Sequence, residues 1–154
     1  RDILKVGAVG NGMINAFRSG GGLIASLALA SLGDFRHKGK LLLVMYLLFG
    51  VGLILYANSP AYILALFFIG IVGVSAAGHD AMSQILLQLN VNEEQRGRAM
   101  GVWQLSIGFG VIGSITLGTL AEVYGVLFAQ SMFGGIMVII VALMYVAVPK
   151  LKEL

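Results

Sequence analysis

The sequence predicts an all-α membrane protein with about five transmembrane helices, and three observations support this prediction. First, 58% of the 154 residues are hydrophobic and only 11% are charged, a balance that no ordinary soluble domain shows. Second, the charged residues fall into short clusters between long apolar runs. Third, these runs are continuously apolar, without the alternation of lipid-facing and lumen-facing residues that a membrane β-barrel requires.

Five apolar runs are long enough to cross the hydrocarbon core as helices, which takes about 20 residues at a rise of roughly 1.5 Å per residue. They lie approximately at residues 6–32, 41–57, 61–89, 99–121 and 126–148. The second run is short, but Lys40 can extend its ammonium group to the interface at the start of this run. The last run ends before Pro149, which cannot continue a helix. Residues 1–154 are therefore predicted to form one helical bundle.

The basic residues predict how the chain is oriented. Seven of the ten lie in the first connector, the third connector and the tail, namely Arg36, Lys38, Lys40, Arg96, Arg98, Lys150 and Lys152. The positive-inside rule places these segments and the C-terminus in the cytoplasm, as expected of a multi-pass protein of the cell inner (plasma) membrane. Arg1 and Lys5 would then lie outside, and a missing upstream helix would remove this exception. We therefore expect the chain to be a fragment.

Composition argues against several other classes of protein. Cysteine is absent and the two histidines, His37 and His79, are far apart in the sequence, so we expect neither a metal site nor thiol chemistry. The net charge of +3 is too small to indicate a nucleic-acid partner. A membrane enzyme would need a nucleophile with a base, a metal cluster or a cofactor loop. We therefore expect no catalytic residue and no cofactor.

The segment GFGVIG at residues 108–113 fits the GxGxxG pattern of dinucleotide-binding proteins. That function requires a preceding strand, an exposed helix N-terminus and an acidic residue about 20 positions later, whereas this segment lies inside the fourth apolar run. Small residues also allow helix backbones to approach each other in membranes. We predict helix packing, not nucleotide binding, for Gly110, Gly113, Ser114 and Gly118.

His79 and Asp80 interrupt the third apolar run. An ionisable group inside a span is costly and by default indicates a functional site. Asp80 lies about 15 Å along the helix from Asn90 at the cytoplasmic end, near the midplane. It either binds a proton or a cationic substrate, or hydrogen-bonds between helices. His79 is turned about 100° away around the helix and is the second candidate.

The further candidates for binding substrate or protons are Gln84, Gln104 and Arg18. Asp80, Gln84 and Gln88 recur every four residues and predict one polar face that meets other helices or a cavity instead of lipid. Gln104 lies at a similar depth in the fourth run. Arg18, in the first run, could bind an anionic substrate, pair with a missing helix or extend to the interface.

Two connectors carry more specific patterns, NVNEEQRGRAMGVWQL at residues 90–105 and ASLGDFRHKGK at residues 30–40. The first resembles the loop between the tenth and eleventh helices of the major facilitator superfamily, in permeases of the drug, macrolide and siderophore exporter type. The second resembles, in degenerate form, the GxxxDRxGRR loop between the eighth and ninth helices, with Phe35 where an arginine is usual. By this alignment the chain holds helices eight to twelve, a partial C-terminal bundle of the transporter.

This resemblance implies a secondary active transporter, specifically a proton-coupled antiporter for efflux of drug-like, macrolide-like or siderophore-like molecules, as in multidrug resistance. The implied partners are a small-molecule substrate, protons, the lipid bilayer and the missing N-terminal helices of the same permease. Alternating access would proceed by rocking one half of the transporter against the other. The alternative is a small stand-alone oligomeric or accessory membrane protein without transport of its own.

The resemblance also implies a cytoplasmic latch. In it, Asp34 caps the helix that begins near Ala99, and the basic residues Arg36, Arg96 and Arg98 lie alongside. A carboxylate is favoured at a helix N-terminus by the backbone N–H groups and the helix dipole. The alternative is that these charges only fix the topology. The segment NEEQRGR, residues 92–98, also fits a helix start with Asn92 as the cap and Gln95 three residues on, although Gly97 favours a break before Ala99.

Overall fold

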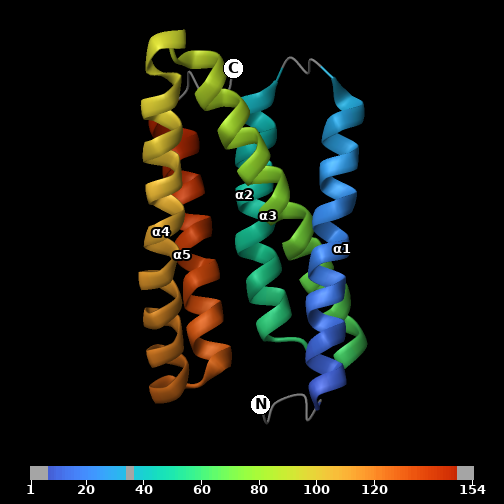
Figure 1. Cartoon of the computed structure of the whole chain (residues 1–154). Coiled ribbons are helices and arrows are strands. Elements are labelled where there is room, and N and C mark those ends of the chain that lie inside the picture. Colours follow the sequence, from blue (N-terminus) through green and yellow to red (C-terminus); the bar gives the residue numbers. More distant parts are fainter. Residues whose placement is uncertain (1–6, 34–36, 149–154) are drawn as a thin grey trace.

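Five α-helices make up the computed structural model, which describes residues 7–33 and 37–148 (Figure 1). They are α1 (Ala8–Leu32), α2 (Lys38–Ala57), α3 (Tyr62–Asn90), α4 (Glu93–Tyr124) and α5 (Val126–Ala147). At about 1.5 Å per residue, their lengths range from about 30 Å for α2 to about 48 Å for α4. The predicted all-α class is confirmed.

Four of the helices in the described ranges, α2 to α5, are long and apolar enough to cross a membrane. Helix α1 has 25 residues, but Asn11, Asn15 and Arg18 make its first half more polar. A helix of this kind can cross the hydrocarbon core only where its polar groups meet other helices or water. The expected five helices are therefore present, and α1 is the one whose composition falls short of a simple lipid-facing span.

Short connectors join the last three helices. Val91 and Asn92 join α3 to α4, and Gly125 alone joins α4 to α5. Gly125 has φ +90°, a backbone conformation that glycine adopts without a steric penalty. The N–H of Gly125 donates to the carbonyl of Ala121 at 3.1 Å. Consecutive helices consequently run antiparallel (Figure 1).

The fourth helix begins at Glu93, with Asn92 at its N-cap position. The start capped by Asn92 is confirmed, and the expected start near Ala99 was wrong. The helix passes through Gly97 without interruption. Two acidic residues, Glu93 and Glu94, lie in its first turn, where the helix dipole favours negative charge. One glycine costs a helix only about 1 kcal/mol. This cost is too small to break a helix whose first turn is stabilised by two acidic residues.

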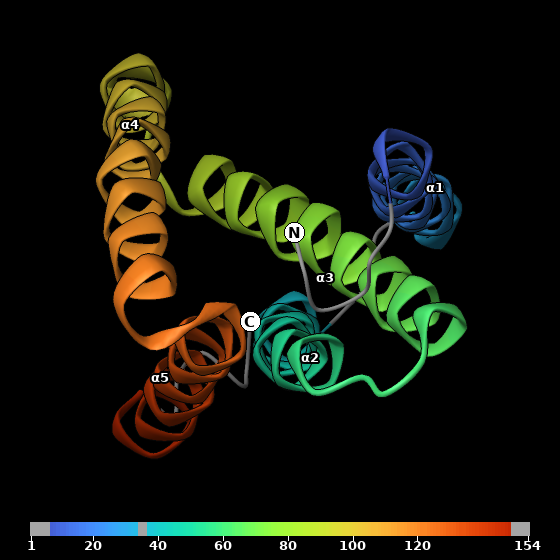
Figure 2. The ribbon, with the colours of Figure 1, turned by 90° about the horizontal axis from the view of Figure 1, so that it is seen from below.

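Helix α3 is central to the bundle. It contacts α1, α2 and α4, whereas α5 contacts α2 and α4, and α1 contacts only α3 among the described helices. In the view along the bundle, α3 lies obliquely across it, with one end near α1 and the other near α4 (Figure 2). Most of the buried apolar side chains belong to α2 and α3, among them Leu43, Ile69, Val72 and Met82. The core therefore lies between these two helices.

Glycines permit the closest helix contacts. At the crossing of α1 and α3, a Cβ on Gly21 would collide with the carbonyl oxygen of Gly70, and a Cβ on Gly73 with that of Arg18. Between α2 and α5, a Cβ on Gly50 would lie 2.9 Å from the carbonyl oxygen of Gly134. Small residues at such crossings allow backbone-to-backbone packing, which stabilises helix pairs in a bilayer.

We expect Gly21→Ala to destabilise the protein by about 1–3 kcal/mol, the usual cost of overpacking, because the obstacle is backbone and cannot move aside. Gly12→Ala in the same helix is the matched control, since a Cβ there meets nothing within 4 Å. Thermal unfolding of the detergent-solubilised protein measures both. Equal unfolding midpoints for the two variants would contradict the close α1–α3 crossing.

Candidate functional site

Asp80 lies on the face of α3 that continues its contact with α1. One and two turns before it, this face packs against α1: the ideal Cβ of Gly73 meets the Arg18 carbonyl, and a Cβ on Gly22 would lie 3.6 Å from that of Ala77. Beyond this level α1 and α3 diverge in both views (Figures 1 and 2). The Asp80 side chain is 56% exposed, so the described helices leave a carboxylate uncovered in the middle of a candidate span.

His79, the next residue, lies on a different side of α3 and packs against α2. Its side chain is only 14% exposed. The imidazole stacks on Tyr46, with ring centroids 4.4 Å apart and planes 16° apart, and Phe49 presents its edge at 5.3 Å. Tyr46 and Phe49 are three positions apart on α2 and therefore share a face. The histidine ring fills an aromatic site in the α2–α3 interface.

The polar atoms around this ring link His79 to Asp80. Nδ1 of His79 lies 3.5 Å from Oδ1 of Asp80. This nitrogen is buried and has no hydrogen-bond partner within the described part of the chain. If both ring nitrogens were protonated, the positive charge of the imidazolium would lie next to the Asp80 carboxylate. One turn along α3, the Tyr46 hydroxyl and Ser83 Oγ lie 3.3 Å apart in a hydrogen bond.

Sequence reasoning missed the α2 partners of this site. Tyr46, Phe49 and Ser83 look like ordinary residues of apolar runs, and only the i, i+3 spacing of the two aromatic residues indicated that they share a face. Which face meets α3 is decided by the packing. The site around His79 therefore draws side chains from α2 and α3, whereas the candidates from the sequence lie on α1, α3 and α4.

The glutamines predicted to extend the polar face differ in their environments. Gln84 is half-buried, and Gln88 and Gln104 are exposed. Nε2 of Gln88 lies 4.0 Å from Sδ of Met100, which links the end of α3 to α4. The described helices therefore do not close a polar cavity around Asp80. A binding role for Gln84 and Gln104 stays a prediction.

Arg18 contributes its backbone to the crossing of α1 and α3, and its side chain is exposed. Within residues 7–33 and 37–148 no ion pair involves its guanidinium group. The charge lies in the middle of a helix whose only described neighbour is α3. Each of its three predicted roles therefore remains open.

The latch prediction falls partly outside the described residues, because Asp34 and Arg36 lie there. Arg96 forms an exposed i, i+3 ion pair with Glu93 at 3.8 Å, and Arg98 is exposed. Among the described helices α1 and α4 are not in contact. The basic residues of the latch thus lie on the first two turns of α4, where they face solvent.

The small residues of α4 point into open space. A Cβ on Gly110, Gly113 or Gly118 would meet nothing within 4 Å, and Ser114 donates only to the carbonyl of Gly110 in its own helix, at 2.8 Å. No residue of α4 is buried. Their predicted role in helix packing stays a prediction, because no described helix lies against them.

These features define a class of protein: a bundle of apolar helices that carries a carboxylate and a guanidinium group inside its helices. In the described part of the chain no group of three His, Cys, Asp or Glu side chains could hold a metal ion. A family model of the Major Facilitator Superfamily matches residues 2–153. The chain belongs to this superfamily, whose members are multi-pass membrane transporters of small molecules. Searches of curated proteins and of solved structures found no match.

We expect His79→Ala to destabilise the protein by about 1–3 kcal/mol, because it removes two aromatic contacts worth roughly 0.5–1.5 kcal/mol each. His79→Phe keeps a ring of similar shape between Tyr46 and Phe49 and should lose much less. Thermal unfolding in detergent distinguishes the two variants. If the phenylalanine variant is as unstable as the alanine variant, stacking is not the stabilising interaction.

Proposed function

We propose that this chain forms part of a proton-coupled exporter of small molecules and that Asp80 is its proton-binding carboxylate. The observation that carries the proposal is the 56% exposure of Asp80 in the middle of a candidate span. An ionised carboxylate that faces hydrocarbon costs several kcal/mol, so such residues face a bundle interior or a water-filled cavity. In a transporter family, that cavity is the transport pathway.

The chemistry required of Asp80 is reversible neutralisation. With the site open to the outside, the carboxylate takes up a proton and becomes neutral. With the site open to the cytoplasm, it releases the proton, and the ionised carboxylate then binds a cationic substrate. Each ligand shifts the conformational equilibrium only by its difference in affinity between the two states. Competition between proton and substrate for one carboxylate would couple inward proton flow to export.

His79 is the second member of the proposed proton site. Its Nδ1, 3.5 Å from the Asp80 carboxylate, can hold a proton next to the negative charge. Because its ring is held by Tyr46 and Phe49 of α2, a change in its charge acts on the α2–α3 interface. Gln84, Gln104 and Arg18 are proposed to contact substrate once the pathway is complete.

The orientation and export direction are also proposals. At the end of the bundle where α3 meets α4, the described connectors and helix starts carry Lys38, Lys40, Arg96 and Arg98. An excess of basic residues marks the cytoplasmic side, so this end and the C-terminus are assigned to the cytoplasm of a cell inner (plasma) membrane. Export of drug-like, macrolide-like or siderophore-like substrates rests on the resemblance of residues 90–105 to an exporter loop.

The placement of the chain as helices eight to twelve of a twelve-helix permease is supported by the open surface of α4. This helix of 32 residues has no buried residue, although its small residues form a stripe suited to close packing. Missing helices of the same permease would cover that surface and complete the pathway. A stand-alone oligomer would instead cover it with a second copy.

Asp80→Asn should abolish proton-coupled efflux in the full transporter while leaving its expression unchanged, because the amide cannot release a proton. Glu94→Gln is the matched control, since Glu94 is an exposed carboxylate at the start of α4. Substrate efflux from vesicles with an imposed pH gradient measures the effect. Undiminished efflux by the asparagine variant would remove Asp80 from the mechanism.

The size of the native protein tests the placement independently. An antibody against the tail PKLKEL, residues 149–154, should detect a band well over twice 16.2 kDa in native membranes. A band near 16.2 kDa would favour the stand-alone oligomer or accessory protein. Cross-linking in the same membranes would then show whether copies of the chain associate.

A further inference from the structure

An apolar groove separates the first half of α2 from the last two turns of α5. Its volume is about 480 Å³. The α2 side is formed by residues at positions i, i+3, i+4 and i+7, and the α5 side by the end of that helix; the lining residues are Lys40, Leu43, Val44, Leu47, Val141, Ala142, Tyr145 and Val146. From Lys40 to Leu47 the groove follows α2 for about 10 Å.

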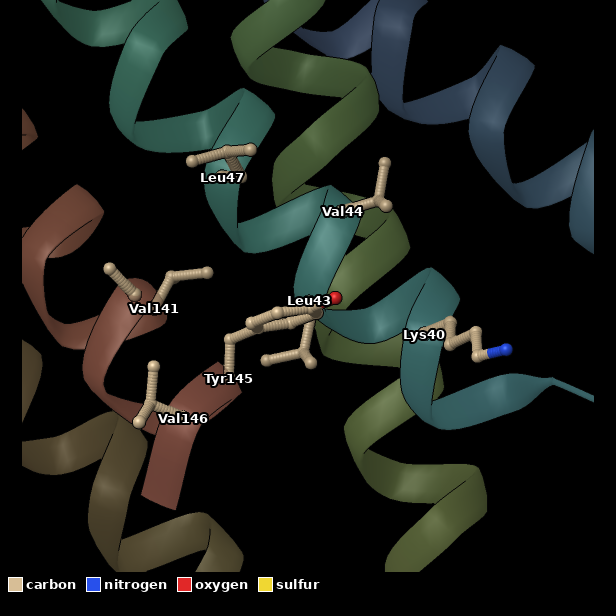
Figure 3. Close-up of a pocket in the computed structure, with 8 residues that line it drawn as sticks. Lys40, Leu43, Val44, Leu47, Val141, Tyr145 and Val146 are labelled. Carbon is tan, nitrogen blue, oxygen red and sulfur yellow. The ribbon is translucent and has the colours of Figure 1, made fainter. Parts of the chain in front are cut away.

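The groove is apolar along its length, and Lys40 lies at one end of it. Tyr145 reaches from α5 across to α2 beside Leu43, and the ammonium group of Lys40 points away from α5 (Figure 3). A second hollow, of about 390 Å³, adjoins the first, and Lys40 and Val44 line both. The stem of Lys40 therefore borders the groove, and its ammonium group lies on the side away from α5, at the start of a candidate span.

The surroundings of Lys40 favour an anion. The first turn of α2 contains no acidic residue. The backbone N–H groups at the helix start and the helix dipole add to the positive potential of the lysine. A lysine at the level of the headgroups, next to an apolar groove that enters the membrane, matches the two parts of an anionic lipid.

We propose that the groove between α2 and α5 binds an anionic phospholipid from the surrounding bilayer. One acyl chain lies in the groove along Leu43, Leu47 and Val141, and the phosphate lies against Lys40. The site is on the side of α2 remote from α1, so it is separate from Asp80 and does not depend on the proposed transport mechanism. Its ligand would hold the ends of α2 and α5 together.

The test compares lipid retention by the full protein after it is extracted from bilayers of phosphatidylcholine mixed with phosphatidylglycerol. Native mass spectrometry counts the phosphatidylglycerol that remains bound. Lys40→Gln should lower its occupancy roughly fivefold, as expected for loss of one lysine near an anionic headgroup. Lys38→Gln is the matched control, because it removes the same charge from the same turn and Lys38 lines neither hollow.

A second pair of variants tests the acyl-chain part of the site. Ala142→Phe fills the groove from an exposed position, and Leu143→Phe adds a ring at an exposed neighbour that does not line it. Only Ala142→Phe should reduce the bound lipid. The proposal fails if the native protein retains no phosphatidylglycerol, if Lys40→Gln retains as much as the native protein, or if each control variant loses as much as its partner.

Discussion

The backbone contact between α1 and α3 is the constraint on which the candidate site depends. At Gly21 and Gly73 neither helix has space for a Cβ, so the two backbones are in direct contact at this level. Contacts of this kind replace the hydrophobic effect as the force that holds helices together in a bilayer, because lipid tails are as apolar as the side chains. Beyond the crossing the helices diverge, and the face of α3 that had packed against α1 becomes open at Asp80.

Two adjacent polar residues of α3 illustrate how a bundle accommodates ionisable groups. The ring of His79 is buried against two aromatic rings of α2. Packing of its apolar faces offsets part of the cost of desolvating the imidazole. Asp80 has no apolar surface of comparable size and points to the open side. A buried carboxylate without partners would be far more costly. The positions of these residues on the helix therefore place one side chain in the α2–α3 interface and leave the other exposed, with only 3.5 Å between Nδ1 of His79 and Oδ1 of Asp80.

Helix α4 shows why a membrane helix can form without a packed core. All its interior backbone hydrogen bonds are local, so the helix satisfies its polar groups whether or not a neighbour is present. Its exposed side chains include Leu105, Phe109, Ile112 and Ile115, which are compatible with lipid. Packing between such helices then depends on the shapes of their surfaces, and the small residues of α4 meet no described helix. Helix α4 is therefore fully formed although none of its residues is buried.

The sequence by itself determined the helical class, the five helices and the presence of a carboxylate inside a span, because apolar length and helical periodicity are local properties of the chain. It did not determine the start of α4, where acidic residues before Gly97 extended the helix to Glu93. It also pointed to the glycines of α4 for packing, whereas the close contacts lie at Gly21, Gly73 and the α2–α5 crossing. Periodicity shows which residues share a face, but only the tertiary structure decides which face meets a neighbour. For the same physical reason the aromatic partners of His79, on a different helix, became visible only when α2 and α3 were packed together.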